Sequence, residues 1–487
     1  VEAAEAPPFF DPNAVVVNLT EDDLNLALED LWSALGARFS GTREQVSSTA
    51  RGLHYDGRLS TPVIDLMPDG RASVRLALEE ATVRLDSVEH TLLGRRVRCE
   101  DIGADLQPDR VLDLELRLDF RLEREDLRIV PTAVDVADPD GAFRLIKPSR
   151  CRRNLIPTFM LWWIAKPFLQ KQFREIDQKL LASAERGAAQ LEDDDGTILR
   201  KRVDVEGHEL VIYPRRLTTD GDALWIVAAG ASDESHPGTT SAEPPRALGR
   251  SSARSFLAVS EPTLNAILDR AYLEWSRPTD RPSGSLRKLF QSDELLTLVP
   301  GLREVENRER LHWGIRFTSP PRVRLETLRD IDARNGDAFS LYAWSPIADQ
   351  PVITLISSGI EVEIARDDAP GEPLGVLSID SGVVSAIPYA NRLGGLSLQV
   401  VRNEWEVSSR GIRFEQRLLA ATLQELIFAE LFETRYEPLA RGALTVGPIR
   451  FEPTGFAVAE GYLIIDLKRV APPPQAATRT DSPRASR

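Results

Sequence analysis

One short phrase occurs twice in this chain, and the repeat constrains the fold more than any single residue does. Its two copies, Thr20-Glu21-x-x-Leu24-Asn25 and Ser260-Glu261-x-x-Leu264-Asn265, lie 240 positions apart. A second pair of matching segments keeps this spacing, because Gly221 and Gly461 stand in similar turn sequences 240 positions apart. The beginning and the end of a large unit therefore recur at one offset, which predicts two similar domains in tandem.

The length agrees with this organisation. At about 150 residues per domain, 487 residues would form about three domains, whereas the repeat predicts two of about 230. Residues 231–255 are rich in Pro, Ser and Gly and are typical of a linker. We expect a flexible leader at 1–14, a first domain at 15–230, the linker at 231–255, a second domain at 256–470 and a disordered tail at 471–487.

Composition excludes some partners. The formal net charge of −15 argues against nucleic acid, whose binding depends on cationic side chains, and against strong adhesion to anionic membranes except through a local basic patch. Arginine supplies 53 of the 60 basic residues, which indicates a GC-rich bacterial genome. No stretch reaches the roughly 20 apolar residues of a membrane-spanning helix.

Each half is predicted to begin with a helix. Thr20 and Ser260 are suitable N-caps, and Glu21 and Glu261 place negative charge in the first turn. Apolar residues then recur at helical spacing. The stripe in the first half is Leu24, Leu28, Leu31 and Leu35, and the stripe in the second half is Leu264, Leu268, Ala271 and Trp275.

Strands are expected to follow each of these helices. Between positions 112 and 122, six apolar residues alternate with five charged ones, which predicts a long strand with one buried face. Similar alternations start at Val74 and occur at 362–364, 396–400 and 405–407. Such one-sided strands are typical of an antiparallel sheet whose apolar face is covered.

A second helix is predicted late in each half, at about 157–186 and about 419–431, and paired strands follow it. The expected fold class is therefore α+β.

This order of elements resembles the tubular lipid-binding superfamily, which includes the bactericidal/permeability-increasing proteins and plasma lipid-transfer proteins. The resemblance covers roughly residues 15–470. It rests on the duplicated helix opening, the central Pro-rich linker, the late helix of each half, and Cys99 with Cys151.

The resemblance implies two similar elongated domains, each a long helix wrapped by a strongly curved antiparallel sheet. It also implies acyl-chain ligands held between helix and sheet, and a location in the bacterial periplasm, at the outer membrane or outside the cell. Family members carry a disulfide where Cys99 and Cys151 stand, so the resemblance implies one here; free thiols in a reducing compartment are the alternative. The chain departs from the animal endotoxin binders in being acidic, which argues against endotoxin killing.

The candidate lipid-binding residues lie on the predicted helices, where the alternative is an ordinary filled core. They are Leu24, Leu28, Leu31, Phe159, Trp162, Trp163, Leu264, Leu268, Leu423 and Ile427.

A membrane-contact patch combines aromatic and basic side chains, which suits a membrane interface. The alternative is that the aromatic side chains pack on the sheet and the basic groups are solvated. This patch consists of Arg152, Arg153, Trp162, Trp163 and Lys166.

Asn25 and Asn265 recur at one helical position. Since Asn is a mediocre residue inside a helix, we expect each to make a structural hydrogen bond to a sheet or loop; a polar contact to a lipid headgroup is the alternative.

No catalytic constellation is visible in the sequence. The five histidines are scattered, no nucleotide-binding or hydrolase motif is present, and two cysteines are too few for a Cys-based metal centre. The sequence thus predicts a non-enzymatic protein, without metal or cofactor, that binds a lipid or another hydrophobic small molecule. Transfer of this ligand is a further expectation. The alternative is a scaffold component of a cell-envelope assembly that uses the same fold without lipid.

Overall fold

A computed structural model gives the structure of the chain, which is described for the following residues. They are 9–35, 37–45, 50–92, 95–123, 126–136, 143–146, 150–151, 201–205, 208–232, 248, 254–275, 299–304, 311–335, 347–366, 372–390, 396–412, 415, 444–446 and 449–470. They fall into two compact units. Unit 1 takes its residues from 1–18, 199–216 and 226–470, and unit 2 from 19–198, 217–225 and 471–487.

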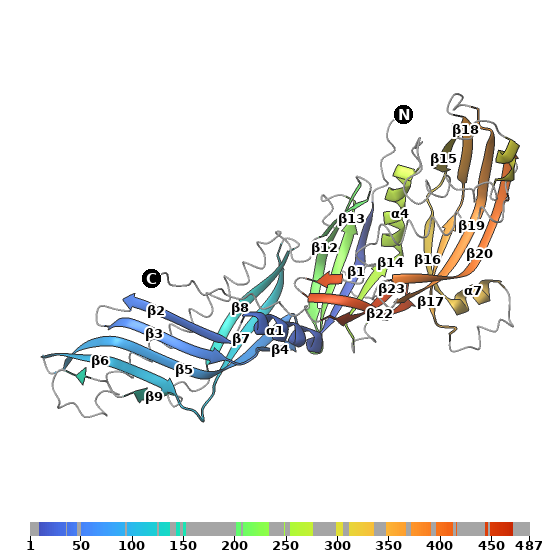
Figure 1. The fold of residues 1–487 in the computed structure, drawn as a ribbon. Coiled ribbons are helices and arrows are strands. Elements are labelled where there is room, and N and C mark those ends of the chain that lie inside the picture. The colour runs from blue at the N-terminus through green and yellow to red at the C-terminus, as the bar shows by residue number, and fades with distance from the viewer. Residues whose placement is uncertain are drawn as a thin grey trace. The chain divides into compact units, whose positions relative to one another are not determined.

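An eight-stranded antiparallel sheet, most of which belongs to unit 1, brings together strands from both ends of the sequence (Figure 1). Its order is β11 (Lys201–Val205), β12 (His208–Thr219), β13 (Ala223–Ala231), β1 (Phe10–Thr20), β14 (Phe256–Ser260), β23 (Tyr462–Arg469), β22 (Ile449–Ala459) and β21 (Leu444–Val446). The strands that precede the two copies of the repeated phrase, β1 and β14, pair with each other, with Val16 opposite Ala258. Every residue of β13 is buried, so both faces of the sheet are covered at that strand.

Unit 2 contains a nine-stranded sheet built around one very long strand. Its strands are β2 (Arg38–Gln45), β3 (Ala50–Leu59), β4 (Val63–Met67), β5 (Arg71–Leu92), β6 (Arg95–Leu106), β7 (Leu112–Glu123), β8 (Asp126–Val136), β9 (Phe143–Ile146) and β10 (Arg150–Cys151). The 22 residues of β5 pair with β3, β4, β6 and β7. The strand predicted at 112–122 is confirmed as β7.

Unit 1 also contains a six-stranded sheet. Its strands are β15 (Leu311–Phe317), β16 (Arg322–Thr327), β17 (Pro351–Ser357), β18 (Ile360–Arg366), β19 (Gly375–Ala390) and β20 (Leu396–Gly411). The alternation predicted at 362–364 lies in β18, and those at 396–400 and 405–407 belong to the single strand β20.

The described helices are short, and the predicted fold class is wrong. They are α1 (Glu21–Leu35), α4 (Glu261–Trp275), α7 (Leu328–Asn335) and the 3₁₀ helix η2 (Pro300–Glu304). Instead of two α+β domains that each wrap a long helix, the described residues form three antiparallel sheets with α-helices of 15, 15 and 8 residues. Pairing of β1 with β14 explains part of the error, because it joins strands from the two sequence halves in one sheet. The late helices expected at 157–186 and 419–431 fall outside the described residues.

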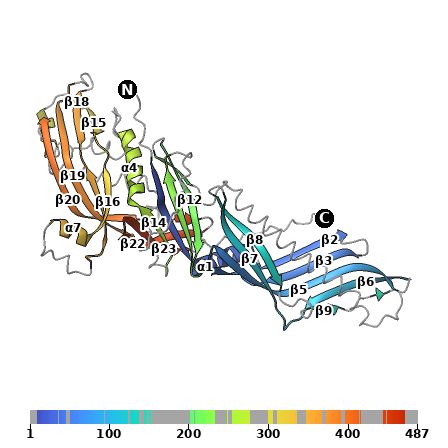
Figure 2. The same ribbon diagram turned by 180° about the vertical axis from the view of Figure 1, so that it is seen from behind.

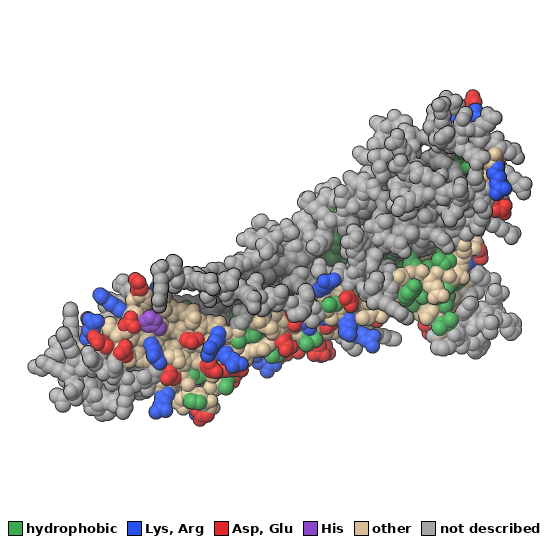
Figure 3. Space-filling model, viewed as in Figure 1, with side chains coloured by type: hydrophobic (Ala, Val, Ile, Leu, Met, Phe, Trp, Pro, Cys, Tyr) green, Lys and Arg blue, Asp and Glu red, His purple; other side chains and the backbone are tan. Residues whose placement is uncertain are grey.

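The sheet of unit 2 is one-sided, as the alternation predicts. Leu112 and Leu114 of β7 are 2% and 8% exposed, whereas Asp113 between them is exposed. On the charged face, cross-strand ion pairs join Arg58 to Glu79 at 3.2 Å and Arg38 to Glu80 at 3.5 Å. Figure 3 shows basic and acidic side chains intermixed over this sheet. Exposed pairs of this kind add little stability, so the buried face carries the packing energy.

A β-bulge keeps the long strand β5 one-sided. The pairing between β3 and β5 shifts by one residue at Leu59, which leaves Glu79 without an opposite residue. From the sequence, Glu79 and Glu80 are interpreted as solvated strand ends; they are exposed but lie within β5. The extra residue changes the alternation, so that Leu78 before it and Leu85 after it are both buried.

Candidate ligand-binding surfaces

In unit 2, helix α1 is fixed to the edge of the sheet by two side chains. The Asn25 amide donates to the carbonyl of Ile64 at 3.0 Å, and the Ile64 N–H donates to Asn25 Oδ1 at 2.7 Å. The N–H of Leu66 donates to Glu21 Oε2 at 2.8 Å. Among the described strands, β4 pairs only with β5, so these bonds satisfy the backbone groups along its other edge.

The same arrangement occurs in unit 1 between α4 and β16. Asn265 donates to the Val323 carbonyl at 2.9 Å and accepts from the Val323 N–H at 2.7 Å. The Leu325 N–H donates to Glu261 Oε2 at 2.8 Å. We call each set of three bonds an edge clamp; the one in unit 2 is formed by Glu21 and Asn25, and the one in unit 1 by Glu261 and Asn265.

Both helices also begin against the turn of a hairpin. The Glu21 N–H donates to the Asp222 carbonyl at 2.9 Å, and the Glu261 N–H donates to the Gly461 carbonyl at 2.9 Å. Gly221 and Gly461 have φ values of 99° and 78°, which glycine adopts without strain. The two repeated segments of each half thus meet in the folded chain.

The edge clamps confirm the structural role predicted for Asn25 and Asn265. The clamp role of Glu21 and Glu261 was not predicted from the sequence, because the helix dipole is sufficient to explain a glutamate in a first turn. Its recurrence 240 positions later, beside a recurring Asn, is the signal that could have revealed this role.

The predicted lipid-contacting leucines of the two helices differ in burial. Leu24, Leu28 and Leu264 are half-buried, whereas Leu268 is 6% exposed. Leu31 lies in α1, but its side chain is outside the described set.

Helices α4 and α1 differ on the face that contains positions 266 and 270 of α4. Ala266 and Arg270 of α4 are 3% and 1% exposed. The corresponding positions of α1 hold Leu26, which is 44% exposed, and Asp30, which is half-buried. Helix α4 lies against β14 and β16 in both views (Figures 1 and 2), so it has neighbours on more than one side.

Arg270 is the largest fully buried side chain among the described residues. Its Nη1 donates to the Ala266 carbonyl at 2.8 Å, and its Nη2 has no hydrogen-bond partner. The ring of Phe9 lies 5.8 Å from its Cζ. Gly230 makes room for this ring, since a Cβ there would lie 3.2 Å from Phe9 Cε1.

Polar groups also gather at the first turn of α4. Ser260 donates to the carboxylate of Asp11 and accepts from the Thr263 N–H at 3.2 Å, as an N-cap does. Tyr462 donates to the carbonyl of Asn13 at 3.0 Å. Burial, together with the negative charges of Asp11 and Glu460, raises the pKa of Tyr462 to about 12.

Apolar side chains line one face of β5 and β7 in unit 2. It consists of Ala72, Val74, Leu76 and Leu78 with their respective partners Leu118, Leu116, Leu114 and Leu112. We call this set the apolar face of unit 2. Ala72, Leu78, Leu112 and Leu114 are buried, whereas the other four residues, Val74, Leu76, Leu116 and Leu118, are half-buried.

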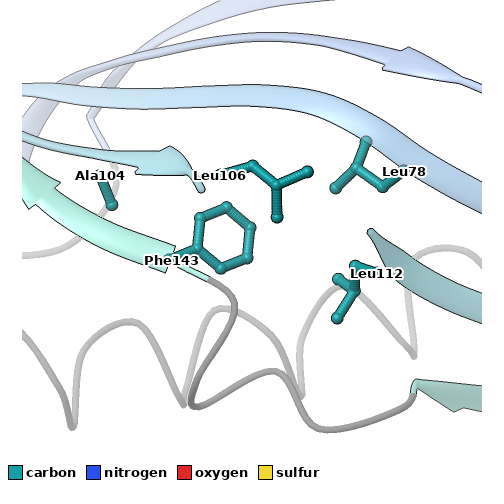
Figure 4. Close-up of a cluster of buried hydrophobic side chains, with 5 residues drawn as sticks. All are labelled: Leu78, Ala104, Leu106, Leu112 and Phe143. Atoms are coloured by element: carbon teal, nitrogen blue, oxygen red, sulfur yellow. The ribbon is translucent and has the colours of Figure 1, made fainter. Parts of the chain in front are cut away.

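One end of the apolar face belongs to a packed cluster. Leu78 and Leu112 point toward Leu106 and Phe143, and Ala104 completes the group (Figure 4). All five side chains are at most 9% exposed. This end is therefore closed by the protein itself, whereas the four half-buried residues of the face are less completely covered.

Cys99 and Cys151 lie directly opposite each other where β6 pairs with β10. Cys99 is 4% exposed. Opposite residues of an antiparallel pair have Cα atoms roughly 4.5–5.5 Å apart, which is within the range of a disulfide.

The other candidate residues lie outside the described part of the chain. They are Arg152, Arg153, Phe159, Trp162, Trp163, Lys166, Leu423 and Ile427. The membrane-contact patch and the ligand contacts of the late helices therefore stay predictions.

Within the described residues, no cluster of three or more His, Cys, Asp or Glu side chains could hold a metal ion. Within the same residues, no helix has the length and apolarity to cross a membrane.

Comparison with known proteins gives distant structural similarities. No model of a known family and no curated protein matches the chain. The crystal structure of lipopolysaccharide binding protein is 12% identical, with a TM-score of 0.41 over 95% of this chain and 100% of that one. P47 of Clostridium botulinum E1 is 9% identical, with a TM-score of 0.27 over 95% and 100%. Takeout 1 of Epiphyas postvittana is 14% identical, with a TM-score of 0.17 over 35% and 83%.

Proposed function

We propose that this protein binds a lipid or another acyl-chain ligand without covalent chemistry, and that the apolar face of unit 2 is one surface that holds it. The observation that carries the proposal is the half-burial of Val74, Leu76, Leu116 and Leu118. These side chains share one face of the sheet, because Val74 is opposite Leu116 and Leu76 is opposite Leu114. Protein cores are normally close-packed, so a row of half-buried leucines and valines has contacts left to make.

The geometry of the row suits a flexible chain. Its residues lie on adjacent strands, and Ile64 of β4 extends it to the strand held by the α1 edge clamp. The clamp satisfies the backbone groups of Ile64, so the surface offers apolar contact without unpaired polar atoms there.

Burial of an acyl chain supplies enough free energy for binding. At about 0.8 kcal/mol per buried methylene, a chain of about ten methylenes gains about 8 kcal/mol before the costs of ordering. Transfer of the ligand between membranes is a further part of the proposal, with the basic and aromatic side chains around Trp162 and Trp163 as the membrane contact.

A cell-envelope or extracellular location is proposed with the function. A disulfide between Cys99 and Cys151 would fit an oxidising compartment such as the periplasm. A duplicated ancestral unit accounts for the two edge clamps and for the close agreement of their hydrogen-bond distances.

Lipid analysis of the purified protein tests the proposal. We expect organic extraction followed by mass spectrometry to recover acyl lipid in stoichiometric amount, and a fluorescent fatty acid to bind after delipidation. Repeated lipid-free preparations that take up no fluorescent lipid would contradict the proposal and favour the scaffold role.

A further inference from the structure

The guanidinium of Arg270 is buried, and neighbouring protein groups satisfy only part of its hydrogen-bonding capacity. Its side chain is 1% exposed, and its bond to Ala266 engages one nitrogen with a neutral carbonyl. The other terminal nitrogen, Nη2, is buried without an acceptor. Buried charges in proteins are normally paired, because removal from water is costly.

The carboxylates of Asp269 and Asp11 have other partners. Asp269 pairs with Arg322 at 2.9 Å, and Asp11 accepts from the hydroxyls of Ser260 and Thr263. Asp269 still acts on Arg270 through space, but burial outweighs it and lowers the pKa of Arg270. The face of Phe9 attracts the cation without providing a hydrogen-bond acceptor.

The fold does not require an arginine at this position. Helix α1 has the same edge clamp and the same start against a hairpin turn, yet it carries Asp30 where α4 carries Arg270. The arginine is therefore a property of α4 alone. A planar guanidinium with a free N–H edge is the side chain best suited to hold a carboxylate or phosphate oxygen.

We propose that Arg270 binds the oxyanion group of an acyl ligand held by unit 1, separate from the chain on the apolar face of unit 2, so that unit 1 selects ligands that end in a carboxylate or phosphate. This inference rests on the proposed function for the acyl chain. The oxyanion would accept from Nη2 and supply the negative charge that the surroundings of Arg270 lack. A water molecule could accept the same bond, but it would leave the charge unneutralised.

Three probes separate the oxyanion from the chain. Oleate carries both, oleyl alcohol carries the chain alone, and inorganic phosphate carries the oxyanion alone. For the delipidated wild-type protein, we expect oleate to bind at least tenfold more tightly than oleyl alcohol. In Arg270→Met the two should bind equally, and in Arg270→Lys a part of the preference should remain.

Thermal melting without ligand distinguishes an anchor from a structural arginine. Loss of an unpaired buried charge should leave the Tm of Arg270→Met without ligand equal to or above that of the wild type. Oleate should raise the Tm of the wild type by more than it raises the Tm of Arg270→Met. Arg324→Met is the matched control, since Arg324 lies on β16 with an exposed side chain paired to Glu326 at 3.7 Å. This control should retain the preference for oleate.

Each outcome has one consequence. Equal affinity of the wild type for oleate and oleyl alcohol would overturn the oxyanion site and leave lipid binding intact. A large drop in the Tm of Arg270→Met, or its failure to fold, would have the same consequence. Stabilisation by phosphate in the wild type but not in Arg270→Met, without binding of either amphiphile, would support the oxyanion site and contradict the proposed function. Absence of binding by all three probes would overturn both.

Discussion

Asn265 makes the two bonds to Val323 that a neighbouring strand would make, and Asn25 does the same for Ile64. A carboxamide can do this because it carries a donor and an acceptor in one plane. The recurrence of Asn at one helical position predicts such a bond, but the partner strand could not be predicted, since it follows each Asn at a different distance: 39 residues for Asn25 and 58 for Asn265.

Replacement of either Asn should destabilise its own unit. Asn265→Ala leaves the Val323 N–H and carbonyl without these partners, and we expect a loss of about 2–4 kcal/mol in the free energy of unfolding. Asn25→Ala should cost a similar amount. Urea unfolding measures both, with the exposed Gln399→Ala as control. A loss below about 0.5 kcal/mol in both variants would show that the edge clamps contribute no net stability.

Tyr462 should make stability depend on pH in the alkaline range. Its pKa is about 12 in the folded protein, against an ordinary value of 10.0. The unfolded chain therefore releases the phenolic proton first, so the stability from this group is complete below pH 10 and falls between pH 10 and 12. A shift of about two units corresponds to roughly 3 kcal/mol.

Tyr462→Phe tests this dependence by chemical denaturation at several pH values. The variant should lose about 1 kcal/mol at pH 7, where the bond to Asn13 is removed. It should also show a shallower decline between pH 10 and 12 than the wild type. Parallel declines in the two proteins would mean that the Tyr462 pKa is not raised.

At the scale of whole elements, the long strand β5 shows what period-two alternation can and cannot predict. The simple alternation of β7 predicts that strand within a residue at its C-terminal end. In β5 the alternation is interrupted at Glu79, so the sequence predicts only the part that starts near Val74. The bulge is set by pairing with β3, and single-strand periodicity carries no information about it.

The pairing of β6 with β10 leads to a prediction about the two cysteines. Cys99 and Cys151 are opposite each other, and a bond between them would close a loop of 52 residues. In the chain-entropy model such a bond stabilises by about 4 kcal/mol. We expect no free thiol in the protein purified without reductant, and a lower Tm after reduction or in Cys151→Ser.

Thiol labelling under denaturing conditions measures the first result directly. Cys99→Ser with Cys151→Ser serves as the control, because its Tm should not respond to reductant. Labelling of two thiols in the unreduced wild type would show that the disulfide is absent.

At the scale of the whole molecule, the same helix–strand junction occurs twice, with different residues on the remaining faces of the two helices. Each copy clamps an edge strand and meets a hairpin turn, as the repeated sequence segments lead one to expect. The exposed Leu26 and the buried Arg270 show the divergence, which the sequence does not reveal. Arg270 is buried in part because Phe9, 261 positions away, lies over it, and such a contact exists only in the folded chain.

The central claim is that an acyl chain lies on the apolar face of unit 2, and photo-crosslinking measures this most directly. A fatty acid with a diazirine in its chain would be bound to the delipidated protein, irradiated and located by peptide mass spectrometry. The account predicts adducts on Val74, Leu76, Leu116 and Leu118, and their loss when unlabelled oleate is added in excess. Adducts confined to the charged face around Arg58 and Glu80, or adducts that excess oleate does not reduce, would contradict it.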